Sequence, residues 1–151
     1  MRIEPVTSKN IEQTAYVHSV SWKESHKSFC SEAFVAEHTA ERQKKYIEQK
    51  MNNGAEFFVL FDKEAKGVVS VSGCMIDDLY VLPSEQRKGY GTILLRYAEQ
   101  KCTDDPVLWV LSNNMAAKSL YLKNGYHFTG KTKALQRQLQ ELEMKTLPNK
   151  A

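Results

Sequence analysis

The sequence predicts one α/β domain, in which a mostly antiparallel mixed sheet is flanked by helices. The chain has 151 residues, a length that suits a single domain, so we assign residues 1–151 to one unit. Short apolar runs between polar turns predict a meander of strands over residues 56–82. Segments with apolar residues at helical spacing precede and follow this meander, and no low-complexity linker divides the chain.

The first third of the chain predicts a short strand followed by helices. Residues 2–6 alternate as an edge strand would. One apolar stripe at helical spacing then indicates a helix that carries Ile11, Ala15, His18 and Trp22. Residues 25–37 suit one short helix, and a longer helix is predicted between Thr39 and the stop signal at residues 53–54.

The middle of the chain predicts the sheet. Residues 56–61 form an almost continuous apolar run, which is typical of a strand covered on both faces. A polar turn at residues 62–67 leads to a second strand at 68–71, and a tight connection leads to a third strand that begins at Ile76. Pro83 ends that strand because it has no N–H group to donate.

The loop at residues 86–92 reads QRKGYGT and precedes a predicted helix. Two glycines one residue apart at a helix start let the chain turn tightly and let a bulky anion approach unpaired N–H groups. The partial positive charge of a helix N-terminus favours a phosphate there. A simple turn is the alternative, since the three-glycine spacing of a dinucleotide-binding fold is absent.

The last third predicts a strand, a helix and a tail of ambiguous structure. Residues 107–111 form an apolar run that is typical of a buried strand. Asn114 is predicted to cap a helix that presents Ala116, Ala117, Leu120 and Tyr121 on one face. The leucines at 135, 139 and 142 keep helical spacing, whereas residues 142, 144 and 146 alternate as a strand, so the pattern leaves both open.

Composition argues against several classes of site. His26 and His38 are interpreted as solvated surface residues rather than catalytic ones, because no metal-ligand spacing joins them. The three cysteines are an odd number without C-x-x-C spacing, which favours reduced thiols. A net charge of +3 is too small and too evenly spread to indicate nucleic-acid binding, and no apolar run approaches the roughly 20 residues that cross a membrane. We therefore expect a cytoplasmic protein with no metal, no nucleic-acid partner and no membrane segment.

Two motifs resemble those of the GNAT N-acetyltransferase family. Residues 86–91 match its acyl-CoA-binding pattern, which is Gln or Arg, two residues, Gly, one residue, and Gly or Ala. Residues 114–126 match a second pattern of Asn, two residues, Ala, three residues, Tyr, three residues, Gly and an aromatic. The resemblance covers most of the chain and implies a single-domain fold with six to seven strands, splayed near the middle of the sheet to admit the cofactor. It also favours a final strand near residues 140–146.

The resemblance implies that acetyl-CoA is the co-substrate. Backbone groups of residues 79–81 would hold its pantetheine arm, and residues 86–92 would hold its pyrophosphate. The side chains of Arg87 and Lys88 can also be interpreted as solvated loop charges, and both interpretations can hold together. For binding the pyrophosphate, the backbone N–H groups of these residues matter more than their side chains. The cofactor-binding residues so implied are Leu79, Tyr80, Val81, Gln86, Arg87, Lys88, Gly89, Tyr90, Gly91, Thr92, Asn114 and Ala117.

Amine acetylation requires a base and gains from an acid. A primary alkylamine has a pKa of about 10.4, so a group on the enzyme or a water chain must take its proton. Tyr121 occupies the family position that faces the CoA sulfur, and its neutral phenol can donate to the leaving thiolate. Asp77 and Asp78 are the candidate bases. Because side chains alternate along a strand, only one of them is expected to face the acceptor, and Asp77 is preferred.

The acceptor is predicted only as a small-molecule or protein amine. In the family, the region that contains Trp22 and His26 walls the acceptor pocket, so both are substrate-binding candidates. The related ribosomal-protein N-terminal acetyltransferases carry a Glu five residues before the motif Asn, where this chain has Trp109, and this weakens a protein N-terminus assignment. Family members are often dimers, so a homodimer is a further possibility. The rival interpretation is an acyl-CoA-binding sensor or scaffold without turnover.

Overall fold

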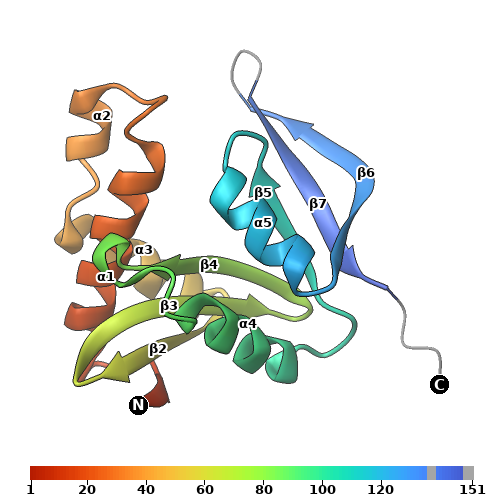
Figure 1. Cartoon of the computed structure of the whole chain (residues 1–151). Coiled ribbons are helices and arrows are strands. Elements are labelled where there is room, and N and C mark those ends of the chain that lie inside the picture. The colour runs from red at the N-terminus through yellow and green to blue at the C-terminus, as the bar shows by residue number, and fades with distance from the viewer. Residues whose placement is uncertain (136–138, 148–151) are drawn as a thin grey trace.

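The computed structural model describes residues 1–135 and 139–147. Its elements, in chain order, are β1 (Arg2–Pro5), α1 (Ile11–His26), α2 (Glu32–Ala36), α3 (Ala40–Asn52), β2 (Glu56–Asp62), β3 (Glu64–Ser72), β4 (Met75–Val81), η1 (Pro83–Glu85), α4 (Tyr90–Lys101), β5 (Val107–Leu111), α5 (Met115–Lys123), β6 (Tyr126–Ala134) and β7 (Gln140–Thr146). The strands form one sheet in the order β1-β2-β3-β4-β5-β7-β6 (Figure 1). Only β4 and β5 pair in parallel, so within the described ranges the sheet is mixed and mostly antiparallel, as predicted.

Helices cover both faces of the sheet, and each face has its own apolar core. One core joins Ile11, Ala15, Val17 and Ile47 of α1 and α3 to Phe57 and Val59 of β2. The other joins Leu94, Leu95, Ala98 and Tyr121 of α4 and α5 to Phe58 and Leu60 of β2. Strand β2 serves both cores because successive side chains point to opposite faces, which explains its continuous apolar run. Among the described residues, none of the helices has the length and hydropathy that a membrane span requires.

Strand β3 begins earlier than predicted, because the turn before it is very tight. Asp62 and Glu64 are register partners, and Lys63 alone connects them, with a φ of 68°. The predicted polar turn over residues 62–67 is therefore wrong, since most of it belongs to a strand that extends the hairpin. The final strand predicted near residues 140–146 is confirmed as β7, which pairs with both β5 and β6.

A β-bulge interrupts β4 at Asp78. Two residues of β4, Asp78 and Leu79, lie opposite Val69 of β3, where the register shifts. Asp78 has a φ of 50°, in the left-handed region that non-glycine residues seldom adopt. An extra residue in a strand breaks the alternation of side chains, so the carboxylates of Asp77 and Asp78 are no longer forced to opposite faces.

Strands β4 and β5 separate after one pair of residues. Met75 lies opposite Val107, and the Val107 N–H donates to the carbonyl oxygen of Cys74 at 2.9 Å. Within residues 1–135 and 139–147, no later residue of β4 pairs with β5. The edge of β4 that faces β5 is thus open from Ile76 onward. The sheet is splayed near its middle, as the resemblance implied.

Candidate active site

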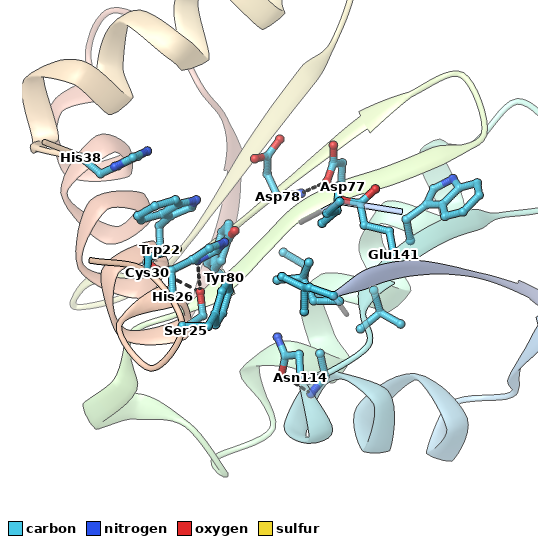
Figure 2. A pocket seen from close by; sticks show the side chains of 18 of the residues that line it. Trp22, Ser25, His26, Cys30, His38, Asp77, Asp78, Tyr80, Asn114 and Glu141 are labelled. Atoms are coloured by element: carbon cyan, nitrogen blue, oxygen red, sulfur yellow. Dashed lines mark hydrogen bonds between the residues drawn. The ribbon is translucent and has the colours of Figure 1, made fainter. Parts of the chain in front are cut away.

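A cleft of about 1500 Å³ lies where the sheet splays. Side chains of α1, α2, α3, β4, β5, α5 and β7 line it. In Figure 2, Trp22, His26 and His38 form one side of it, and Asp77 and Glu141 lie across from them. The sequence-predicted residues that line the cleft are Trp22, His26, Asp77, Asp78, Leu79, Tyr80, Asn114, Ala117 and Tyr121.

Asp78 lies at the centre of a buried polar network. His18 Nε2 and the Tyr46 hydroxyl both donate to Asp78 Oδ1 at 2.9 Å. Lys50 Nζ and Ser70 Oγ both donate to Asp78 Oδ2, also at 2.9 Å. Since Asp78 is only 8% exposed, these four donors replace the water that an ionised carboxylate requires.

The network keeps Asp78 ionised. Burial alone would raise the pKa of Asp78, but the hydrogen bond and charge of His18, together with Lys50, lower that pKa well below its usual range. Burial would likewise lower the pKa of Lys50, but the two aspartates raise it instead. The pKa of Tyr46 is raised by burial and by the charge of Asp78, so its phenol stays neutral and donates.

Asp77 is held beside this network but faces solvent. Its Oδ2 accepts from Lys50 Nζ at 3.0 Å and its Oδ1 accepts from the backbone N–H of Asp78 at 2.9 Å. More than half of its side chain, 59%, is exposed. Lys50 therefore bridges both carboxylates on one side of β4. The prediction that only one aspartate faces the cleft is wrong, because the bulge at Asp78 cancels the alternation of the strand.

Tyr121, on α5, lines the cleft. It is 8% exposed and its ring lies 6.0 Å from that of Tyr126. The hydroxyl of Tyr121 has no protein hydrogen-bond partner in the part of the chain that the structure describes. Burial, and then the charge of Asp77, raise the pKa of Tyr121, so this phenol remains a neutral proton donor.

The glycine loop lies outside the lining of the cleft, at the start of α4. Gly89 is the N-cap residue with a φ of 89°, and Arg87 has a φ of 66°. No side chain caps α4, so its first N–H groups remain available, as anion binding requires. The side chain of Tyr90 is already occupied, because its hydroxyl donates to Asp62 Oδ2 at 2.6 Å. This loop can thus hold a phosphate mainly through its backbone.

Asn114 connects the cleft to α5. Its side chain accepts a hydrogen bond from the backbone N–H of Ala117 at 3.1 Å, which is the helix cap that the sequence predicted. Both residues line the cleft beside the open edge of β4. Among the described residues, no group of acidic, histidine or cysteine side chains has an arrangement that could hold a metal ion.

An aromatic stack forms the wall on the side of α1. The indole of Trp22 lies between two imidazoles, with ring centroids 3.9 Å from His26 and 3.5 Å from His38. Phe34 of α2 packs edge-on against Trp22 at 6.0 Å. His38 is buried at 8% exposure and His26 is half-buried. The interpretation of both histidines as solvated surface residues is therefore wrong, because Trp22 and Phe34 pack against His38, and Trp22 and Phe29 pack against His26.

A sequence model of the acetyltransferase (GNAT) family matches residues 11–126 of the chain. The chain belongs to this family. The match covers most of the sheet, the glycine loop and the Asn114 helix, and the GNAT family consists of acyltransferases that use an amine acceptor. No curated protein matches the sequence significantly.

Solved structures have the same GNAT fold. The PaiA N-acetyltransferase of Thermoplasma acidophilum, in complex with coenzyme A, aligns with a TM-score of 0.68 and 22% identity over 96% of this chain and 99% of that one. A GNAT acetyltransferase of Bacillus cereus has a TM-score of 0.73 and 14% identity, covering 97% and 98%. The ribosomal-protein-alanine N-acetyltransferase of Brucella melitensis has a TM-score of 0.68 and 13% identity, covering 98% and 100%. At these identities the likeness concerns the fold.

Sequence reasoning missed several residues of this site, among them Lys50, His18 and Glu141. Lys50 and His18 reach Asp78 from helices 28 and 60 residues away, and neither belongs to a motif. His18 stood out only as a polar residue on an apolar stripe, which is a signal for a buried partner. Glu141 lines the cleft from β7, whose structure the pattern alone left open. Only tertiary pairing brings these side chains together.

Proposed function

We propose that the protein transfers an acetyl group from acetyl-CoA to a primary amine by direct attack. The observation that carries this proposal is the position of Tyr121, a neutral phenol that lines the cleft where β4 and β5 separate. We call the part of the cleft that is lined by Trp22, His26 and His38 its acceptor half. A thioester laid along the open edge of β4 would have its sulfur between Tyr121 and this acceptor half.

The residues around the splay suit acetyl-CoA. The open backbone edge over residues 77–81 can pair with the amide groups of a pantetheine arm, and Asn114 and Ala117 border the same space. The uncapped N–H groups of α4 suit a pyrophosphate. The coenzyme A complex of the Thermoplasma relative, which has the same fold, supports this assignment.

Asp77 is the proposed base. It is exposed in the cleft and oriented by Lys50 and by a backbone N–H group, so it can accept a proton from the amine directly or through water. Asp78 is not suited to this role, because four donors already occupy its oxygens, and two of them, His18 and Lys50, hold its pKa low. Asp78 would instead hold the bulge that presents Asp77.

Tyr121 is the proposed acid. Its phenol would donate a proton to the departing thiolate, whose free thiol has a pKa of about 8.5. A covalent acyl-enzyme is not part of this proposal. Burial raises the pKa of Cys102 to about 11, and its sulfur lies against the carbonyl oxygen of Ala98, so Cys102 is poorly suited as a nucleophile.

The acceptor in this proposal is a small-molecule or protein amine. The alternative is an acyl-CoA-binding sensor without turnover, which the same open edge and glycine loop would also serve. Two features of the cleft favour an enzyme over a sensor. The side chains of Tyr121 and Asp77 line one cleft, and the charge of Asp77 adds to burial in raising the pKa of Tyr121, so the phenol stays protonated beside the proposed base.

The first test is calorimetric titration of the purified protein with acetyl-CoA and, separately, with CoA. Micromolar binding is expected. Thiol release is then followed with spermidine, L-lysine, kanamycin and a tetrapeptide that has a free N-terminus. Release of CoA that depends on one of these amines supports the enzyme, whereas binding without any amine-dependent release favours the sensor. If the folded protein binds neither acetyl-CoA nor CoA, the proposal is wrong.

A further inference from the structure

The hydrogen bonds of His26 determine where its ring proton lies. His26 Nδ1 is 2.8 Å from the carbonyl oxygen of Trp22, which can only accept, so Nδ1 carries the hydrogen. Ser25 Oγ donates to the same carbonyl at 3.0 Å and can therefore accept from Nδ1, which lies 2.8 Å away (Figure 2). In the neutral ring the remaining lone pair is consequently on Nε2.

The ring of His26 is also held rigidly. It stacks on Trp22 with only 9° between the ring planes, and the far face of Trp22 stacks on His38 with 11° between the planes. Phe29 lies 5.2 Å from His26. A ring fixed by two hydrogen bonds and a stack loses little further conformational entropy when it binds a ligand.

His26 Nε2 is available to a ligand in the cleft. His26 lines the acceptor half, and Nε2 has no hydrogen-bond partner among residues 1–135 and 139–147. Burial lowers the pKa of His26, which favours the neutral ring with its free lone pair. The other titratable groups on the walls of this cleft are His18, Cys30, His38, Arg42, Tyr46, Asp77, Asp78, Tyr80, Tyr121 and Glu141.

We propose that His26 is an acceptor-binding residue whose Nε2 lone pair receives an N–H of the incoming alkylammonium. The proposal rests on the amine-acetylating function above. It adds that the acceptor amine binds in its protonated, positively charged form. An ammonium group has three N–H donors and no acceptor, so it requires lone pairs such as this one. His26 would orient the amine before Asp77 takes its proton.

Two substitutions of His26 distinguish the contribution of its Nε2 lone pair from that of its stacking on Trp22. His26→Phe keeps a flat ring against Trp22 but removes both nitrogens, and His26→Gln places an amide oxygen near the position of Nε2. The matched control is His127→Phe, because His127 is exposed on β6 and is not among the residues that line the cleft. Thermal unfolding and acetyl-CoA affinity are measured for each variant to establish that it is folded and binds its co-substrate.

Steady-state kinetics use the amine from the series above that is acetylated fastest. His26→Phe is expected to raise the KM for this amine about tenfold or more, as for a lost hydrogen bond to a charged group, with the acetyl-CoA affinity unchanged. His26→Gln is expected to recover most of that loss, and His127→Phe to behave as the parent. An unchanged amine KM in folded His26→Phe would overturn the proposal.

The pH dependence gives a readout that a purely structural role would not change. When the pH falls through the pKa of His26, Nε2 gains a proton and becomes a donor that repels the ammonium, so the amine KM of the parent rises. In His26→Gln this rise is expected to disappear, because an amide does not titrate there. A rise that persists unchanged in His26→Gln would contradict the assignment.

Nitrogen-15 spectra of the histidine rings test the inference even if no amine in the series is acetylated. The protein saturated with CoA is expected to show His26 with hydrogen on Nδ1 at pH 7.5. Addition of n-butylammonium chloride should shift the Nε2 resonance of His26 and leave that of His127 in place. Hydrogen on Nε2, or equal responses of the two histidines, would refute the proposal without bearing on cofactor binding.

Discussion

His18 Nε2 donates a hydrogen bond of 2.9 Å to Asp78 Oδ1, and this bond joins the first long helix to the bulge of β4. The side-chain amide of Gln43 in α3 lies within hydrogen-bond distance, 2.8 Å, of the other ring nitrogen of His18, so both α1 and α3 are tied to the same point. Lys50 extends the connection to Asp77. The helical wall of the acceptor cleft is thereby fixed to the strand that carries the proposed base.

Loss of the Asp78 charge should destabilise the fold. In Asp78→Asn, the half-buried Lys50 and the other donors lose the buried carboxylate that they share, and breaking a pair whose acidic partner is buried typically costs about 3 kcal/mol or more. Urea unfolding should show this as a lower midpoint with an unchanged slope. Asp77→Asn is the matched control and should change the free energy of unfolding by less than about 1 kcal/mol, since Asp77 is largely exposed. Equal losses in the two variants would contradict the network.

The free energy of unfolding should depend on pH in the acidic range because of Asp78. The folded-state pKa of Asp78 lies below the value of about 3.9 for an unfolded Asp, so the folded state binds fewer protons. Its stabilising contribution is therefore present above about pH 4 and is lost as the pH falls below that value. The difference in unfolding free energy between the parent and Asp78→Asn should be constant from pH 7 to 5 and should shrink below pH 4. A difference that grows on acidification would show that the sign is wrong.

Tyr121→Phe should separate turnover from cofactor binding. If the phenol protonates the leaving thiolate, its removal should lower kcat about 10²-fold. The acetyl-CoA affinity measured by calorimetry should change little, because the aromatic ring still fills its place beside Tyr126. The sensor interpretation predicts no functional consequence of this change. An unchanged kcat would remove Tyr121 from the proposed mechanism.

Gly89→Ala should weaken acetyl-CoA binding. Gly89 has a φ of 89° at the N-cap of α4, and an alanine there costs about 1–2 kcal/mol or forces the loop to rearrange. Rearranged N–H groups would hold the pyrophosphate less well, so we expect an increase in Kd of roughly tenfold. The control is Gly54→Ala, at a φ of 99° after α3, which should lower stability similarly but leave the acetyl-CoA Kd unchanged. Identical effects of the two variants on Kd would exclude a direct role of the loop.

Local patterns in the sequence determined the element types, the antiparallel meander and the two motifs. They succeeded where a property is local, as for the cap that Asn114 gives to Ala117 or the apolar run of β2. They failed at the turn around Lys63 and at the bulge at Asp78. Both residues have a positive φ, which sequence patterns predict from glycine, and neither residue is a glycine. The patterns also left the tail ambiguous, and its strand was favoured by the resemblance rather than by the pattern.

Tertiary structure alone decided which side chains meet in the cleft. The bulge at Asp78 turned two consecutive carboxylates toward Lys50, and the return of α2 over α1 buried His38 against Trp22. Each of these contacts joins residues that are distant in the chain or breaks the period of its own strand. Periodicity reports which face of an element is buried, but it does not report which element will cover that face. That choice follows from packing the whole chain.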